Sequence, residues 1–218
     1  MKAWFALLFG VVATPVFAQQ PAAVLPPVPD PAETYLIYLH GRIVEDLGPR
    51  PTDPRFGLYD YPAILEALAR RGATVISSQR PPDTNVNEYA GIVVAQVESL
   101  IHRGVPPGNI VVAGFSKGGD IAIHVSSFLR RSEVRFVLLA ACWPRPGEPQ
   151  LRLTGRVLSI YETSDSLAGS SCEPLARHPE KPRSFREISI STGLSHGAFY
   201  TPTKDWVDPV LDWVHGGG

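Results

Sequence analysis

The chain alternates between short apolar runs and longer segments with helical periodicity, and this order constrains its fold more than any other feature. Unbroken apolar strands that alternate with amphipathic helices are typical of a parallel sheet covered on both faces. We therefore expect a three-layer α/β/α sandwich with a mostly parallel central sheet. The expected strands are 34–40, 73–78, 109–113, 134–140, 156–162 and 184–190, and the expected helices are 61–71, 85–103, 117–130 and 206–215.

In such a sheet, ligands bind beyond the carboxyl ends of the strands, so the residues that follow each strand are the candidates for a site. The formal net charge is −1 and the positive residues are scattered, which argues against a nucleic-acid-binding surface. Neither cysteine has a histidine or a second cysteine at metal-ligand spacing. We therefore expect no metal, no cofactor and no nucleic-acid partner.

The N-terminus has the composition of a targeting segment. Lys2 precedes an apolar run from Ala3 to Val16, and the small residue Ala18 follows this run. The pattern predicts a secretory signal peptide over residues 1–18 that is cleaved after Ala18. The alternative is an uncleaved membrane anchor, but the run is shorter than the roughly 20 residues that span a bilayer.

The segment 19–33 is rich in proline and predicts an extended leader. Residues 34–218 are enough for one α/β domain. Once the signal is removed we expect a periplasmic or secreted protein without stable membrane insertion. In an oxidising compartment Cys142 and Cys172 are a candidate disulfide, with two buried, unpaired thiols as the alternative.

A glycine-rich turn, Gly114-Phe-Ser-Lys-Gly118, follows the expected strand 109–113. A phosphate-binding loop of the Walker type places its lysine before the hydroxyl residue, whereas Lys117 follows Ser116. The Gly-x-Ser-x-Gly spacing suits a sharp strand-to-helix turn that raises a serine hydroxyl above the sheet, because side chains two residues away would clash. We therefore predict a nucleophilic serine, with a serine that only caps the helix as the alternative.

A serine hydroxyl needs a base that accepts its proton, and the base needs an acid that holds its tautomer. Asp165 follows the strand 156–162, and His196 follows the strand 184–190. Both residues are therefore expected at the same edge of the sheet as Ser116. We predict Ser116 as the nucleophile, Asp165 as the acid and His196 as the base.

Three other residues remain alternatives for these roles. Glu162 stands at the end of its expected strand and Glu173 lies well into the following loop, so either could replace the acid. His178, in an Arg-His-Pro loop, is the alternative base. His102, His124 and His215 fall on expected helices, where solvated or packed roles are the simpler expectation.

The loop after the first strand reads His40-Gly41-Arg42 and is expected to supply half of an oxyanion hole. The backbone N–H of Arg42, or of its neighbour Ile43, would join that of Lys117 in receiving the oxyanion. His40 is expected to support this loop and not to perform chemistry.

These residues resemble the α/β-hydrolase fold family of serine esterases, lipases and peptidases. The resemblance covers residues 34–215 and rests on His40-Gly41, the turn around Ser116, and Asp165 and His196 in the family's order. It implies acyl transfer to water through an acyl-enzyme on Ser116. An exported serine hydrolase, a small carboxylesterase acting on a small-molecule ester, is the function that we expect.

The chain departs from the family in two places. The loop after Gly41 lacks the further glycines of some esterases, and the chain between the strands 134–140 and 156–162 is too short for a large cap domain. An interfacial lipase with a helical cap is therefore not expected. The alternatives are a peptidase or thioesterase with the same three residues, and a non-catalytic binding protein with the same fold.

Three cations, Arg42, Arg80 and Lys117, fall near the expected active edge. They suggest a pocket for an anionic substrate. The alternative is that Lys117 pairs with Asp120 one turn along the helix and that the arginines are solvated. We expect this pairing and these solvated arginines, and not a pocket for an anionic substrate.

Overall fold

The central sheet is entirely parallel and has six strands in the order β4-β1-β5-β6-β7-β8. The structure is a computed structural model that describes residues 24–143 and 150–216, so the expected signal peptide and the start of the leader lie outside the described residues. The strands are β1 (Tyr35–Leu39), β4 (Thr74–Ile76), β5 (Ile110–Phe115), β6 (Arg135–Leu139), β7 (Arg156–Glu162) and β8 (Ser184–Ile190).

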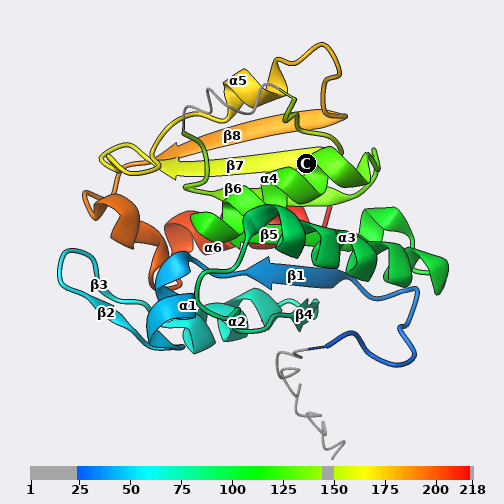
Figure 1. Ribbon diagram of the computed structural model, residues 1–218, viewed down its shortest axis with the longest axis horizontal. Helices are drawn as coiled ribbons and strands as arrows, with labels where there is room; N and C mark the ends of the chain where they lie inside the picture. Colours follow the sequence, from blue (N-terminus) through cyan, green and yellow to red (C-terminus); the bar gives the residue numbers. More distant parts are fainter. Residues whose placement is uncertain (1–23, 144–149, 217–218) are drawn as a thin grey trace, which may run out of the picture.

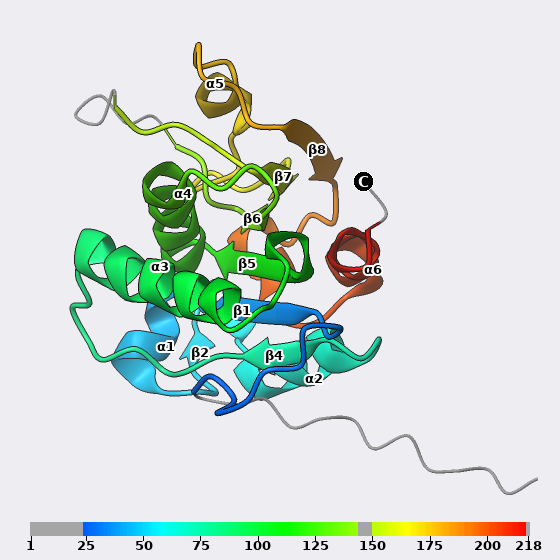
Figure 2. The same cartoon turned by 90° about the vertical axis from the view of Figure 1, so that its right-hand side faces the viewer.

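Helices cover both faces of the sheet (Figure 2). One face carries α3 (Val86–His102) and α4 (Lys117–Leu129), and the other carries α2 (Tyr61–Ala69) and α6 (Lys204–Val214). Because side chains alternate across a strand, neighbouring residues of the fully buried β1 enter two different apolar cores. The expected three-layer sandwich is confirmed, and the expected elements shift by only a few residues at their ends.

The carboxyl ends of the strands form one edge of the molecule (Figure 1). The connections there contain elements that the sequence pattern does not predict: the helix α1, the hairpin of β2 and β3, and the 3₁₀ helix η2. Their bounds are Arg42–Leu47, Thr52–Asp53, Gly57–Leu58 and Ser195–Phe199. In the described part of the chain no cap domain covers this edge.

The described part of the leader lies at the opposite, amino end of the strands (Figure 1). Arg103 Nη1, just beyond α3, donates a hydrogen bond of 2.8 Å to Pro26 O, and Asn109 Nδ2 donates one of 3.1 Å to Pro31 O. The described part of the leader therefore leaves the carboxyl edge uncovered. Among residues 24–143 and 150–216, no helix is both long and apolar enough to cross a membrane.

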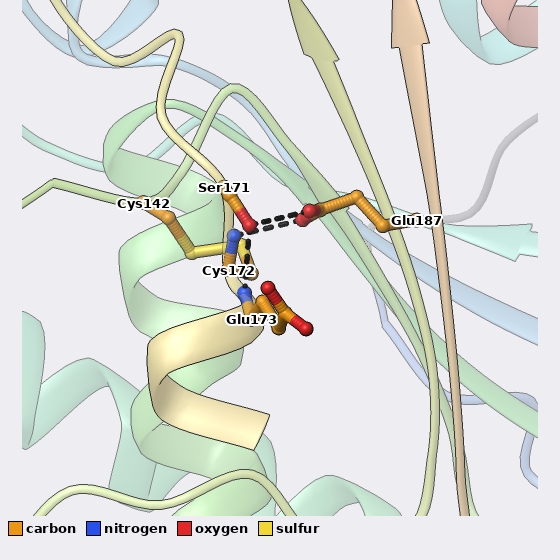
Figure 3. The surroundings of a disulfide bond; sticks show 5 residues. All are labelled: Cys142, Ser171, Cys172, Glu173 and Glu187. Carbon is orange, nitrogen blue, oxygen red and sulfur yellow. Dashed lines mark hydrogen bonds between the residues drawn. A yellow bond between two sulfur atoms is a disulfide. The ribbon is translucent and has the colours of Figure 1, made fainter. Parts of the chain in front are cut away.

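Cys142 and Cys172 are joined in a disulfide that links the chain after β6 to the start of α5 (Glu173–Ala176). Figure 3 shows that Glu187 lies beside this link, where its carboxylate accepts hydrogen bonds from Ser171 Oγ and from the backbone N–H of Cys172 at 2.7 Å. The disulfide and these hydrogen bonds thus tie the far end of the loop after β7 to the chain that follows β6 and to β8.

Removing the disulfide is expected to lower the free energy of unfolding by about 3–4 kcal/mol, because the bond closes a loop with a sequence separation of 30 residues. The comparison is urea unfolding of the wild type and the double variant Cys142→Ala/Cys172→Ala without reductant. Two free thiols in the denatured, purified exported protein would contradict the pairing itself.

Candidate active site

Ser116 sits in a strained backbone conformation between β5 and α4, with φ 53° and ψ −120°. Its N–H donates to Leu139 O of β6 at 2.9 Å, which fixes the turn above the sheet. A Cβ on Gly114 would lie 2.1 Å from Gly118 O, and a Cβ on Gly118 would lie 2.0 Å from Leu39 O. Both glycines of the Gly-x-Ser-x-Gly turn are therefore required by close backbone contact.

Ser116, His196 and Asp165 form one hydrogen-bonded chain. His196 Nε2 lies 3.0 Å from Ser116 Oγ, and His196 Nδ1 lies 2.6 Å from Asp165 Oδ2. Because a carboxylate only accepts, Nδ1 carries the proton and Nε2 is free to accept the serine proton. Ser116 is half-buried, whereas the other two residues are buried.

Several interactions keep the Asp165 carboxylate ionised. Burial alone would raise its pKa, but the hydrogen bond and charge of His196 and two backbone N–H donors more than offset this effect, so the pKa is lowered. The donors are Leu167 N at 2.8 Å and Ala168 N at 3.2 Å, both to Oδ1. Asp165 therefore presents a fixed negative charge to the imidazole.

Glu162, an alternative acid, has a different environment. Its Oε2 accepts from the N–H and the hydroxyl of Ser164, and its Oε1 accepts from the N–H of Thr192 at 2.9 Å and of Gly193 at 3.1 Å. Burial would raise the pKa of Glu162, but these donors lower it. Its carboxylate thus ties the loop of Asp165 to the loop of His196.

The other two alternatives lie in the segment around α5. Glu173 is in the first turn of this helix and pairs with Arg177 at 2.8 Å. His178 follows the helix, and its Nδ1 accepts the N–H of Glu180 at 3.2 Å. Among the candidate acids and bases, all within the described residues, only Asp165 and His196 join the hydrogen-bonded chain to Ser116.

Aromatic rings surround the imidazole of His196. The ring of Phe115 lies 4.7 Å from it and that of Phe56 lies 5.9 Å from it, measured between centroids. Phe56 comes from the β2–β3 hairpin, whose turn is held by Asp53 Oδ1, an acceptor for the N–H groups of Arg55 and Phe56. The rings restrict the orientation of the imidazole and its contact with water.

The loop after β1 lies directly beside the nucleophile. A Cβ on Gly41 would meet the ring of Phe115 at 3.0 Å and Ser116 Cβ at 3.8 Å. Arg42 begins α1 and Lys117 begins α4, so neither backbone N–H has a carbonyl partner one turn earlier within its helix. The two predicted oxyanion donors are thus the first residues of two helices near Ser116.

His40 supports this loop through both ring nitrogens. Nδ1 bonds Gly41 O at 2.8 Å, and Nε2 accepts the N–H of Arg80 at 2.9 Å, so the ring is neutral with its proton on Nδ1. Burial, together with the charges of Arg80 and Lys117, lowers the pKa of His40 from 6.5 to about 3.

The buried neutral His40 makes the fold sensitive to acid. Its folded pKa of about 3 lies below the unfolded value of 6.5, so the unfolded chain binds the extra proton and stability falls as the pH drops between these values. The cost reaches about 3 kcal/mol at pH 4. The slope of unfolding free energy against pH is expected to be smaller in His40→Asn, and equal slopes would contradict this.

The cations near the edge form ion pairs, and the expected partner of Lys117 was wrong. Lys117 Nζ lies 2.6 Å from Glu45 Oε2, while Asp120 lies beside His124. Arg80 is not solvated, since its Nε lies 2.8 Å from Glu45 Oε1 in a fully buried pair. A carboxylate on another helix, α1, thus reaches Lys117 in place of the neighbour one turn along α4.

Arg42 is the one cation of the three that is exposed, and it lies near Asp46 and Asp83. We therefore expect no strong preference for anionic substrates. Values of kcat/KM for neutral and carboxylated esters should agree within about fivefold, the limit set by exposed ion pairs worth up to about 1 kcal/mol. A larger preference that is lost in Arg42→Ala would contradict this expectation.

Sequence reasoning missed several residues of this site. One of them is Tyr200, whose ring centroid lies 6.4 Å from that of His196. Tyr200, Phe56 and Glu45 lie on or beside short elements without a periodic pattern, and only the Asp-Pro-Arg-Phe-Gly turn at 53–57 offered a signal, for a hairpin. Glu162 was noticed, but its role in joining two loops depends on the parallel pairing of β7 with β8.

Solved structures of other proteins share this architecture. A variant of Arabidopsis thaliana SOBER1 superposes with a TM-score of 0.59 at 14% sequence identity, over 84% of this chain and 98% of that one. Esterase PE8 superposes with a TM-score of 0.56 at 16% identity, over 89% of this chain and 97% of that one. The chain has the α/β-hydrolase fold.

At these identities the likeness shows the fold alone. No protein-family model and no curated protein sequence matches the chain. The function of the chain is therefore inferred from its own residues.

Proposed function

We propose that the protein is an exported serine hydrolase that cleaves carboxylic esters through an acyl-enzyme. The observation that carries the proposal is the chain of hydrogen bonds from Ser116 through His196 to Asp165, at 3.0 and 2.6 Å. A serine that only capped α4 would need no such partners. The side chain of Ser116 makes no cap hydrogen bond.

In the proposed reaction, Ser116 Oγ attacks the ester carbonyl carbon while its proton passes to His196 Nε2. Asp165 stabilises the resulting imidazolium. The carbonyl oxygen becomes an oxyanion that accepts hydrogen bonds from the backbone N–H groups of Lys117 and Arg42.

The intermediate then collapses, and His196 gives its proton to the departing alcohol. Water attacks the acyl-enzyme with the same base, which returns Ser116 to its free form. The strained turn keeps the hydroxyl accessible, since Ser116 is half-buried whereas the residues before it in β5 are buried.

Export is part of the proposal. The signal-like residues 1–18 and the Cys142–Cys172 disulfide both fit an oxidising compartment. Secretion from cells that express the full chain should yield a mature protein whose first residue is Gln19. A chain that keeps residues 1–18 in the membrane fraction would contradict export.

The ester specificity is tested with purified mature protein and a panel of p-nitrophenyl esters, matched thioesters and peptide amides. Oxygen esters of small acids are expected to give the highest kcat/KM. Faster turnover of the thioester or the amide of the same acid would replace the esterase with a thioesterase or a peptidase. No turnover of any substrate would favour a binding protein.

A further inference from the structure

A buried carboxylate connects the two helices that begin at the proposed oxyanion donors. Glu45 is on α1, and its side chain is fully buried. Its two oxygens are bound separately, Oε2 by Lys117 Nζ at 2.6 Å and Oε1 by Arg80 Nε at 2.8 Å. A buried carboxylate that binds two cations, one after β4 and one on α4, is held in a single position.

The ion pair Glu45–Lys117 joins α1 and α4, the two helices whose first residues are the proposed oxyanion donors. Arg42, one donor, begins α1, and Glu45 follows it by one turn of that helix. Lys117 is itself the other donor through its backbone N–H, while its side chain reaches Glu45. One ion pair therefore fixes the first turn of α1 against the first residue of α4.

The helix α1 has little intrinsic stability to hold its own position. It has six residues, its N-cap Gly41 provides no side-chain hydrogen bond, and it ends at Gly48 with φ 88°. Helices this short are marginal without tertiary contacts. The placement of the Arg42 N–H consequently depends on what binds α1.

A second set of contacts holds α1 from the side of β4. The guanidinium of Arg80 donates to His40 O as well as to Glu45, and Gln79 Nε2 donates to Val44 O at 3.2 Å. These bonds hold α1 against the loop after β4 but do not reach α4. Backbone packing holds the start of α4 near the end of β1, since a Cβ on Gly118 would lie 2.0 Å from Leu39 O. The Lys117 side chain adds a direct link from α4 to α1 itself.

We infer that Glu45 and Lys117 are positioning residues whose ion pair sets the separation of the two oxyanion donors. The inference rests on the proposed function for its catalytic consequence, while the link between α1 and α4 stands on its own. The loop after His40 has no further glycines and leads directly into α1, so the proposed Arg42 donor moves with the first turn of that helix.

The decisive variant is Lys117→Met, which breaks the link but leaves Glu45 paired with Arg80. Replacement of Glu45 would instead leave a buried guanidinium with fewer partners. The matched control is Lys204→Met on α6, where the lysine is exposed and lies 3.6 Å from Asp208. Lys117→Arg is the rescue variant, since a guanidinium can also bind the Glu45 carboxylate.

Two readouts separate the link from the reaction. Hydrogen exchange of the α1 amides is expected to be at least about tenfold faster in Lys117→Met, and unchanged in Lys204→Met. In ester hydrolysis, kcat of Lys117→Met should fall about 10–100-fold with KM nearly unchanged, because loosening a donor costs less than removing it. Lys117→Arg should recover most of that loss.

Unchanged exchange in Lys117→Met would overturn the inference, and so would a loss confined to KM or an equal loss in Lys204→Met. A wild type that hydrolyses no ester would instead overturn the proposed function. In that case hydrogen exchange still decides whether the link holds α1.

Discussion

Replacing Ser116 with alanine is expected to lower kcat for ester hydrolysis by about 10⁶-fold while the protein stays folded. The hydroxyl is the only group removed, and alanine has the same Cβ in the same strained turn. Its loss leaves the proposed base without a nucleophile. Turnover of a p-nitrophenyl ester by purified wild type and Ser116→Ala measures the effect, and thermal unfolding checks the fold.

The matched control is Ser99→Ala on α3, remote from the carboxyl edge. This variant should retain wild-type turnover. If Ser116→Ala kept more than a few per cent of the activity, the hydrolysis would come from another group or from a contaminant, and Ser116 would be only a turn residue.

The second large effect is expected at the acid. Asp165→Asn should lower kcat about 10⁴-fold, because an amide offers the imidazole an N–H and favours the tautomer whose Nε2 carries the proton. That tautomer cannot accept the proton of Ser116. Activity against a fixed ester, with circular dichroism as a check of folding, is the measurement.

Glu162→Gln provides the comparison for this assignment. Glu162 accepts hydrogen bonds from Ser164, Thr192 and Gly193, so the neutral amide should loosen the two loops and lower the free energy of unfolding. Its loss of kcat should be much smaller than that of Asp165→Asn. The opposite ranking, with Glu162→Gln inactive and Asp165→Asn nearly as active as the wild type, would transfer the role of the acid to Glu162.

The layers of the fold were predictable because long periodic segments carry their own signal. The apolar runs around β5 and β6 and the amphipathic pattern of α3 specify strand and helix without knowledge of the rest of the chain. The parallel sheet then follows from their alternation, and it brings Ser116, Asp165 and His196 to one edge. Their geometry agrees with the predicted roles, which activity measurements must test.

The parts that escaped prediction depend on contacts between distant residues. The helix α1 is too short for a periodic signal, and the sequence pattern pointed to Asp120 as the partner of Lys117 because it lies one turn away. Glu45 is 72 residues from Lys117 and 35 from Arg80, so only the packed structure brings the three together. Tertiary contacts thus determine which charges pair, whereas the local spacing suggested a different pair.

The central claim is that Ser116 is an activated nucleophile. The most direct test treats folded, mature protein with a fluorophosphonate and identifies the labelled peptide by mass spectrometry. We expect one adduct per chain, on Ser116, formed with loss of fluoride, and no adduct in His196→Ala or after unfolding. No adduct on Ser116 in the folded wild type, or equal labelling in His196→Ala, would contradict it.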